Sequence, residues 1–239
     1  MKPVEKPLRL LVCIRPIPNI GSDGPTRLSA LEAAMQMAKA HSSEITVLAP
    51  NEPGGEDALR SCLALAADSA YLVQGPAVCE LDTIAIAQLM AGAVTRLEAA
   101  TGPFAVILCA DSDPGQDGLG PALSAWLGLP QITGVCSFEL NGRSLRVRRN
   151  WDDEFTWLRV ETPCVLSFLR PSSPVPYPAL PRLMAANRAE IPTILTQRES
   201  YLYQTASSHI QPKDRLMLDG SDPHIAEILI KLLKEEHIL

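Results

Sequence analysis

The chain has 239 residues, of which 46% are hydrophobic and 20% charged, with a formal net charge of −6. This composition is globular, with enough apolar material for a core and no mark of disorder. The acidic balance argues against an electrostatic nucleic-acid binder, so no nucleic-acid partner is expected.

The first 128 residues alternate four times between strand and helix patterns. A continuous apolar run over 10–14 is expected of a parallel strand buried on both faces, and further strands are expected at 44–49, 70–74 and 104–110. Helix-forming composition and spacing cover 28–40, 55–67, 82–97 and 121–128. The alternation predicts an α/β fold, a doubly wound parallel sheet with right-handed crossovers.

The pattern then changes to the alternation of half-buried strands. Two alternating runs flank Asn141-Gly142, which predicts a type I′ hairpin over 136–149. Further strands are expected at 155–160 and 164–169, so antiparallel strands should occupy about 133–169. The basic residues of this region are expected to form a solvated strand face rather than a phosphate-backbone site. They are Arg143, Arg146, Arg148 and Arg149.

Proline dominates after residue 170. Leu180 stands between Pro178 and Pro181, in a segment that looks too broken for a helix, so a stiff surface loop is expected over 174–190. Its leucine is either folded back onto its own domain or offered to a partner. The sequence thus divides into an α/β nucleotide-binding domain over 1–190 and a C-terminal arm over 191–239. The arm is expected to end in an amphipathic helix capped by Asp222.

The six cysteines are spread singly, with no C-x-x-C motif, and most lie inside apolar runs. They are interpreted as small buried hydrophobes in a reducing compartment. The first residues show no signal-peptide pattern, and no apolar run reaches membrane-spanning length. We therefore expect a cytoplasmic protein without membrane insertion.

Ligands of an open parallel sheet bind at the C-terminal ends of its strands. Neither G-x-G-x-x-G nor G-x-x-x-x-G-K-[ST] occurs, which argues against a dinucleotide dehydrogenase and a P-loop ATPase. The stretch ADSDPGQDGLGP (110–121) combines three glycines with a following helix start, a pattern that lets backbone N–H groups approach an anion. Its three aspartates would repel a phosphate. On spacing alone, an ordinary glycine-rich turn is favoured over a phosphate site.

Catalytic constellations are missing from the sequence. The four histidines have no metal-ligand spacing, and there is no G-x-S-x-G elbow and no Cys/His pair. The residues therefore favour a binding protein over an enzyme with its own acid, base or nucleophile, and no metal site is expected.

Five segments, taken together, resemble the β-subunit of electron-transfer flavoproteins. In chain order they are LRLLVCIRPIP, SALEAAMQMAK, EDALRSCLALAADSAYLV, GPALSAWLGLPQITGVCSFELNGRSLRVRRNWDDE and YPALPRLMAANRAEI, and they span roughly residues 8–191. The resemblance implies an adenine-nucleotide α-hydrolase-like, Rossmann-like domain that pairs with a homologous α-subunit. It also implies an electron carrier subunit rather than an enzyme.

The resemblance further implies cofactors. The heterodimer carries FAD, held mostly by the α-subunit, and the β-subunit typically buries AMP, or a second flavin in bifurcating members. Carried over to this chain, the cofactor-binding positions are Cys13, Arg15, Pro25, Ala49, Asp113, Gly115, Gln116, Gly118 and Gly120. Cys13 and Ala49 would lie against the adenine, and the glycine loop would hold the phosphate. Where the family has a G-Q-x-G-P pattern, this loop has GQDGLGP.

In that family the proline-flanked leucine belongs to a recognition loop that docks a flavin dehydrogenase. The positions that match are Tyr177, Leu180, Pro181 and Met184. The leading hypothesis is a β-like subunit that accepts electrons from a dehydrogenase and passes them to the respiratory chain or another acceptor. The alternative is a stand-alone adenine-nucleotide-binding or sensor module of the same superfamily. An adenylate-using ligase or hydrolase would lack its phosphate motif.

Overall fold

The computed structural model describes residues 7–15, 29–75, 82–110, 118–151, 154–168 and 177–196, together with Ile230 and Lys234. Residues 1–204 and 205–239 form two units, and all described residues except Ile230 and Lys234 belong to the first. The predicted helix cap at Asp222 lies outside the described residues.

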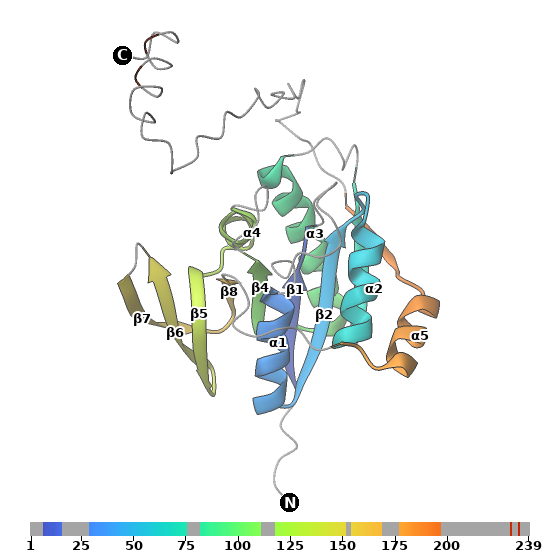
Figure 1. Ribbon diagram of the computed structural model, residues 1–239, viewed down its shortest axis with the longest axis horizontal. Coiled ribbons are helices and arrows are strands. Elements are labelled where there is room, and N and C mark those ends of the chain that lie inside the picture. Colours follow the sequence, from blue (N-terminus) through green and yellow to red (C-terminus); the bar gives the residue numbers. More distant parts are fainter. Residues whose placement is uncertain are drawn as a thin grey trace, which may run out of the picture. The chain divides into compact units, whose positions relative to one another are not determined.

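The first unit is built on a nine-stranded sheet with strand order β7-β6-β5-β8-β4-β1-β2-β3-β9 (Figure 1). From β5 to β9 every neighbouring pair is parallel, and β5-β6 and β6-β7 are antiparallel. The strands are β1 (Leu8–Cys13), β2 (Ser43–Pro50), β3 (Ser69–Gln74), β4 (Val106–Ala110), β5 (Gln131–Asn141), β6 (Ser144–Trp151), β7 (Glu154–Glu161), β8 (Cys164–Phe168) and β9 (Thr193–Leu195).

Helices cover both faces of the parallel part. They are α1 (Ser29–Ala40), α2 (Gly55–Leu65), α3 (Thr83–Thr101), α4 (Leu119–Leu127) and α5 (Leu180–Arg188). Successive side chains of a strand point to opposite faces, so Leu10 and Val12 pack with α1 and α2, whereas Leu11 and Cys13 pack with α3 and α4. This arrangement confirms the predicted doubly wound α/β fold. No helix of the described segments is long and apolar enough to cross a membrane.

The strand order reverses beside β1. The chain leaves β1 on one side through β2 and β3, and then returns to the other side through β4. The carboxyl ends of β1 and β4, at Cys13 and Ala110, therefore border the crevice in which open α/β sheets bind ligands.

One strand of the expected antiparallel region is parallel. The prediction of antiparallel strands over 133–169 holds for β5, β6 and β7 and is wrong for β8, which pairs parallel with β4 and β5. All five residues of β8 are buried, because the strand lies inside the sheet. A continuous apolar run without alternation is typical of a strand covered on both faces.

The predicted hairpin between β5 and β6 is present, shifted by one residue. Asn141 pairs with Ser144, so the two turn residues are Gly142 and Arg143 rather than Asn141 and Gly142. Gly142 has a φ of 63°, the left-handed conformation that a glycine adopts without a steric penalty.

The segment expected to be a stiff loop contains a helix. Residues 180–188 form α5, so the prediction of a loop throughout 174–190 is wrong for them. Pro181 lies in the first turn, where the missing N–H has no intrahelical acceptor to lose and the fixed φ suits a helix. After α5, the short strand β9 adds to the sheet beside β3, an element that the sequence pattern did not predict.

Two glycines provide a paired test of this packing. A Cβ on Gly55, the first residue of α2, would lie 2.6 Å from the carbonyl oxygen of Pro50, which is backbone and cannot rotate away. A Cβ on Gly92, within α3, would meet nothing closer than 3.5 Å. We expect Gly55→Ala to lower the free energy of unfolding by about 1–3 kcal/mol, as overpacking does. Gly92→Ala should raise it by up to about 1 kcal/mol, because alanine is the better helix former. Urea denaturation measures both free energies of unfolding. If both variants changed this free energy in the same direction, the packing described would be contradicted.

Candidate functional site

The described cofactor-binding candidates gather at the carboxyl edge of the sheet. Cys13 ends β1, Ala49 is the penultimate residue of β2, and Gly118 and Gly120 lie at the start of α4. A Cβ on Gly120 would lie 3.5 Å from the Cβ of Cys109, the register partner of Cys13. The other candidates, Pro25, Asp113, Gly115 and Gln116, lie outside the described residues.

The cysteines at this edge are packing residues. Cys13 and Cys109 are cross-strand neighbours and both are fully buried. The hydrogen bond with the Cys109 thiol and the burial together raise the pKa of Cys13 well above its usual value. Burial likewise raises the pKa of Cys62 and of Cys164 to about 12. The thiols of Cys13, Cys62 and Cys164 therefore stay protonated at neutral pH and are poor nucleophiles, and their burial confirms the interpretation of these cysteines as small buried hydrophobes.

Arg15 joins three elements at the same edge. Its Nε and Nη2 donate to the two carboxylate oxygens of Glu52, at 3.2 and 3.1 Å, and its Nη1 donates to Thr83 Oγ1 at 3.2 Å. Glu52 follows β2, and Thr83 begins α3. The side chains of Arg15 and Glu52 are 17% and 6% exposed, so this two-pronged ion pair is largely withdrawn from water. The described contacts of Arg15 therefore hold the edge together, and its role toward a cofactor stays a prediction.

Glu52 and Thr83 were not identified from the sequence. The signal for Glu52 is its position two residues after a buried strand, because residues after neighbouring parallel strands meet at one edge of the sheet. An acidic residue in that position is a natural partner for a basic residue after β1.

Breaking this ion pair from one side should be costly. Arg15→Met would leave a nearly buried carboxylate without its guanidinium, and we expect the free energy of unfolding to fall by about 2–4 kcal/mol. The double variant Arg15→Met/Glu52→Leu should recover a large part of that loss, since no buried charge remains without a partner. Urea denaturation of Arg15→Met, Glu52→Leu and the double variant measures the coupling between the two residues. If the two single losses of unfolding free energy simply added up in the double variant, there would be no coupling.

The start of α4 has the backbone geometry of an anion-binding turn. Gly118 has a left-handed φ of 96°. Among the described residues, no side chain caps the first turn and no atom lies within 4 Å of the position of a Gly118 Cβ. A Cβ on Gly120 would fall 2.1 Å from Ser167 Oγ, so the glycine lets α4 pack closely against β8. First-turn N–H groups with no side-chain cap can donate to an anion placed there.

The docking candidates lie at the other end of the sheet. Leu180 and Met184 are on α5, Pro181 is in its first turn, and Tyr177 precedes it fully exposed. Leu180, Leu183 and Met184 follow the i, i+3, i+4 spacing of one helix face, and Leu180 is 67% exposed. The Arg182 side chain of α5 reaches the carbonyls of Leu63 and Ala67, just before β3 begins. Helix α5 therefore lies beside α2, with its first turn near the end of α2 that is away from the carboxyl edge (Figure 1).

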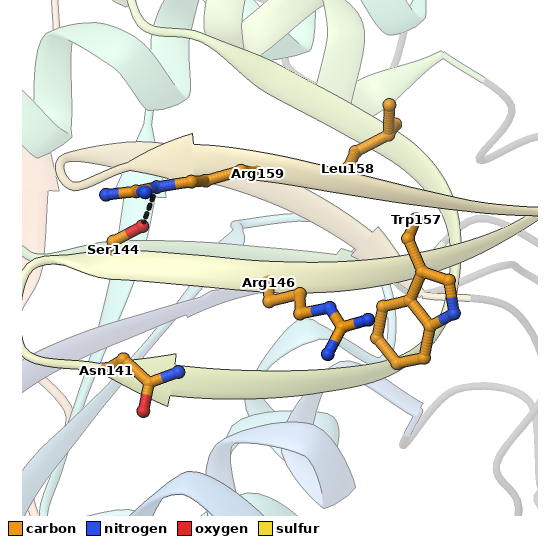
Figure 2. Close-up of a pocket in the computed structure, with 6 residues that line it drawn as sticks. All are labelled: Asn141, Ser144, Arg146, Trp157, Leu158 and Arg159. Atoms are coloured by element: carbon orange, nitrogen blue, oxygen red, sulfur yellow. Dashed lines mark hydrogen bonds between the residues drawn. The ribbon is translucent and has the colours of Figure 1, made fainter.

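A further hollow of about 410 Å³ lies over the antiparallel strands (Figure 2). The guanidinium of Arg146 stacks on the Trp157 ring at 4.2 Å, and Arg159 donates to Ser144 Oγ. Arg146 and Arg159 also pair with Glu139 and Glu161, at 3.8 and 3.1 Å. The hollow is lined by Asn141, Ser144, Arg146, Trp157, Leu158 and Arg159. The exposure and ion pair of Arg146 agree with the interpretation of this arginine as part of a solvated strand face. Arg148 and Arg149 are only half-exposed and, as neighbours along β6, lie on opposite faces of the sheet, so the interpretation does not hold for all four arginines.

The comparison with known families decides what kind of chain this is. The family described as "Electron transfer flavoprotein domain" matches residues 23–195. The chain belongs to the electron transfer flavoprotein family. The resemblance found in the five sequence segments is thereby confirmed.

Several curated electron transfer flavoprotein relatives resemble the chain. "Protein FixA" of Azorhizobium caulinodans is 32% identical over 174 residues, 70% of this chain and 61% of that protein. The "Electron transfer flavoprotein subunit beta" of Megasphaera elsdenii is 30% identical over 195 residues, 79% of this chain and 71% of that protein. The protein of the same name from Clostridium acetobutylicum is 29% identical, over 70% of this chain and 63% of that protein. The chain thus spans less than two thirds of the length of two of these relatives.

Proposed function

We propose that the chain is the β-like subunit of a heterodimeric electron transfer flavoprotein, taking electrons from a flavin dehydrogenase and passing them to the respiratory chain or another acceptor. The observation that carries the proposal is the family match over residues 23–195. Two of the relatives described above are named as subunit beta of an electron transfer flavoprotein, which supports a partner-dependent carrier rather than an enzyme. The buried cysteines without disulfides support a reducing compartment such as the cytoplasm.

The carboxyl edge is the proposed nucleotide site. The backbone at Cys13 and Ala49 would border an adenine, and the start of α4 at Gly118 and Gly120 would donate N–H groups to a phosphate. The residues described there fit such a group, because no described side chain caps the first turn of α4 and no described atom lies within 4 Å of a Cβ at Gly118. Bound FAD, held mostly by the α-like partner, supplies the electron-carrying chemistry, and AMP is the proposed nucleotide of this chain. The chain's own residues would bind and orient the nucleotide, and the Arg15–Glu52 ion pair would hold the ends of β1 and β2 in position around it.

Helix α5 is the proposed docking surface for the dehydrogenase. Leu180, Leu183 and Met184 put apolar side chains in water at 67%, 38% and 48% exposure, on one side of a short helix. Such a cluster is stabilised when a partner covers it.

Nucleotide content tests the carrier role directly. We would purify the chain alone and co-expressed with an α-like protein, denature both samples, and identify the released nucleotides by mass spectrometry. AMP from this chain, with FAD only in the pair, is the expected result. Release of FAD from this chain alone would show that a second flavin occupies the site in place of AMP. If neither sample released a nucleotide, the cofactor assignment would be wrong.

A matched pair of glycine variants localises that nucleotide. Gly118 and Gly142 both have left-handed φ values, 96° and 63°, and open space around a new Cβ. An alanine at either position carries a similar backbone strain of about 1 kcal/mol. Gly118→Ala should lower the AMP released per chain, because the first-turn N–H groups move, whereas Gly142→Ala in the β5–β6 turn should leave it unchanged. If both variants lost the same amount of AMP per chain, backbone strain alone would explain the loss and Gly118 would not be part of the nucleotide site.

Two exposed leucines test the docking surface. Leu180→Ala should leave folding and flavin content intact and weaken the interaction with the dehydrogenase by about 2 kcal/mol at most, seen as slower electron transfer. Leu195→Ala is the control, because Leu195 is 65% exposed on β9 and is not on α5. If Leu180→Ala unfolds the protein, or both variants slow transfer equally, the docking assignment fails.

A further inference from the structure

Helix α5 has little apolar anchorage. Of its nine residues only Ala186 is buried, and neither flanking residue caps the helix with a side chain. A helix of this length is marginal in water without tertiary contacts. Its position against the domain must therefore depend on contacts other than a buried apolar face.

Arg60 of α2 supplies one set of these contacts. Its Nη1 donates to the carbonyl oxygens of Ala186 and Ala189, at 2.8 and 3.1 Å, at the C-terminal end of α5. Glu56, one turn earlier on α2, accepts from Nη2 and Nε of the same guanidinium at 2.6 and 3.1 Å. The carboxylate thus orients the guanidinium. The guanidinium donates a second hydrogen bond to the Ala186 carbonyl, which already accepts from the N–H of Ala189, and one to the carbonyl of Ala189, the residue after the helix.

Arg182 of α5 supplies the reciprocal set. Its Nε donates to the carbonyl of Leu63 and its Nη2 to the carbonyl of Ala67, both at 3.1 Å, at the C-terminal end of α2. Each helix therefore sends one arginine to the carbonyl end of the other, which requires an antiparallel pair. Figure 1 shows the two helices side by side. A cation at a helix C-terminus is also favoured by the helix dipole.

These four hydrogen bonds are directional, whereas apolar contact is not. Carbonyls at the two ends fix both the register of α5 along α2 and its rotation about its own axis. The rotation decides which side chains of α5 meet water.

We propose that Arg60 and Arg182 are positioning residues for partner docking, which fix α5 so that Leu180, Leu183 and Met184 are presented together to the dehydrogenase. The inference rests on the proposed function for its partner, and on the contacts above for its geometry. Neither arginine touches a cofactor in this account. Both act through the helix that they hold.

The test combines hydrogen exchange with electron-transfer kinetics on the full chain co-expressed with its α-like partner. The variants are Arg60→Met and Arg182→Met, with Arg188→Met as the control, since Arg188 lies on α5 outside the four capping contacts. The probe is a flavin dehydrogenase, reduced by its own substrate, that is first shown to transfer electrons to the unmodified pair. We expect faster amide exchange over 180–189 in both variants but not in the control. The apparent KM for the carrier should rise about tenfold with kcat unchanged. Arg60→Lys, which keeps a charged donor, should recover part of the loss.

Three outcomes count against the inference, and each has its own cause. Unchanged exchange over 180–189 in both variants would show that the arginines do not hold α5. Faster exchange with an unchanged KM, while Leu180→Ala still raises KM, would show that docking does not need a fixed helix. If neither the arginine variants nor Leu180→Ala changes KM, the proposed docking surface itself is wrong.

Discussion

Burial of β1 and β4 on both faces constrains the rest of this molecule. Residues from Leu10 to Cys13 and from Val106 to Ala110 are all buried, so each strand must be covered above and below. Helices α1 and α2 cover one face and α3 and α4 the other, and crossovers of this kind produce the reversal of strand order at β1 and β4. That reversal creates the edge at which the nucleotide site is proposed. The fold and the site thus follow from one requirement, that apolar strands be covered on both sides.

Several arginines connect elements at the margins of the sheet. The chain is acidic overall, yet Arg15 ties together the end of β1, the residue after β2 and the start of α3. Arg60 and Arg182 tie α2 to α5, and Arg9 stacks on Phe104 at 4.5 Å while donating to the Gly102 carbonyl. Apolar packing stabilises without direction, whereas a guanidinium with several donors fixes both distance and angle. The core therefore sets the fold, and these arginines set the orientation of the elements at its margins.

The two surfaces with proposed roles are separated by the length of α2. This helix starts beside Glu52, at the carboxyl edge of the sheet, and ends at the carbonyls that Arg182 binds. Under the proposed function, the dehydrogenase would dock at α5, away from the carboxyl edge at which the nucleotide site is proposed.

The sequence by itself determined the elements whose formation depends on local pattern. The first four strands and the helices between them appear where composition and periodicity place them, the β5–β6 hairpin appears with its turn shifted by one residue, and the five family segments already identified the family. The pairing of β8 and the helical conformation of α5 could be established only from the tertiary structure. Residues 164–168 became a parallel strand because β4 and β5 lie on either side, and a run of five residues does not specify which strands will neighbour it. Residues 180–188 form a helix that contacts α2 through Arg60 and Arg182, which lie far from their partners in the sequence.

The candidate site likewise has residues that the sequence predicted and contacts that it did not. The positions at the strand ends were visible in the sequence, since a residue that follows a buried strand must lie at the carboxyl edge. The partner of Arg15 was not, because Glu52 is 37 residues away along the chain and meets it only after β1 and β2 have paired. Hydrogen bonds between distant side chains depend on the register of the whole sheet, which local sequence does not encode. The sequence alone therefore determined the first four parallel strands and the helices between them. Helix α5, strand β9, the pairing of β8 and the side-chain contacts at the candidate site were decided only by the tertiary structure, because they depend on residues far apart in the chain.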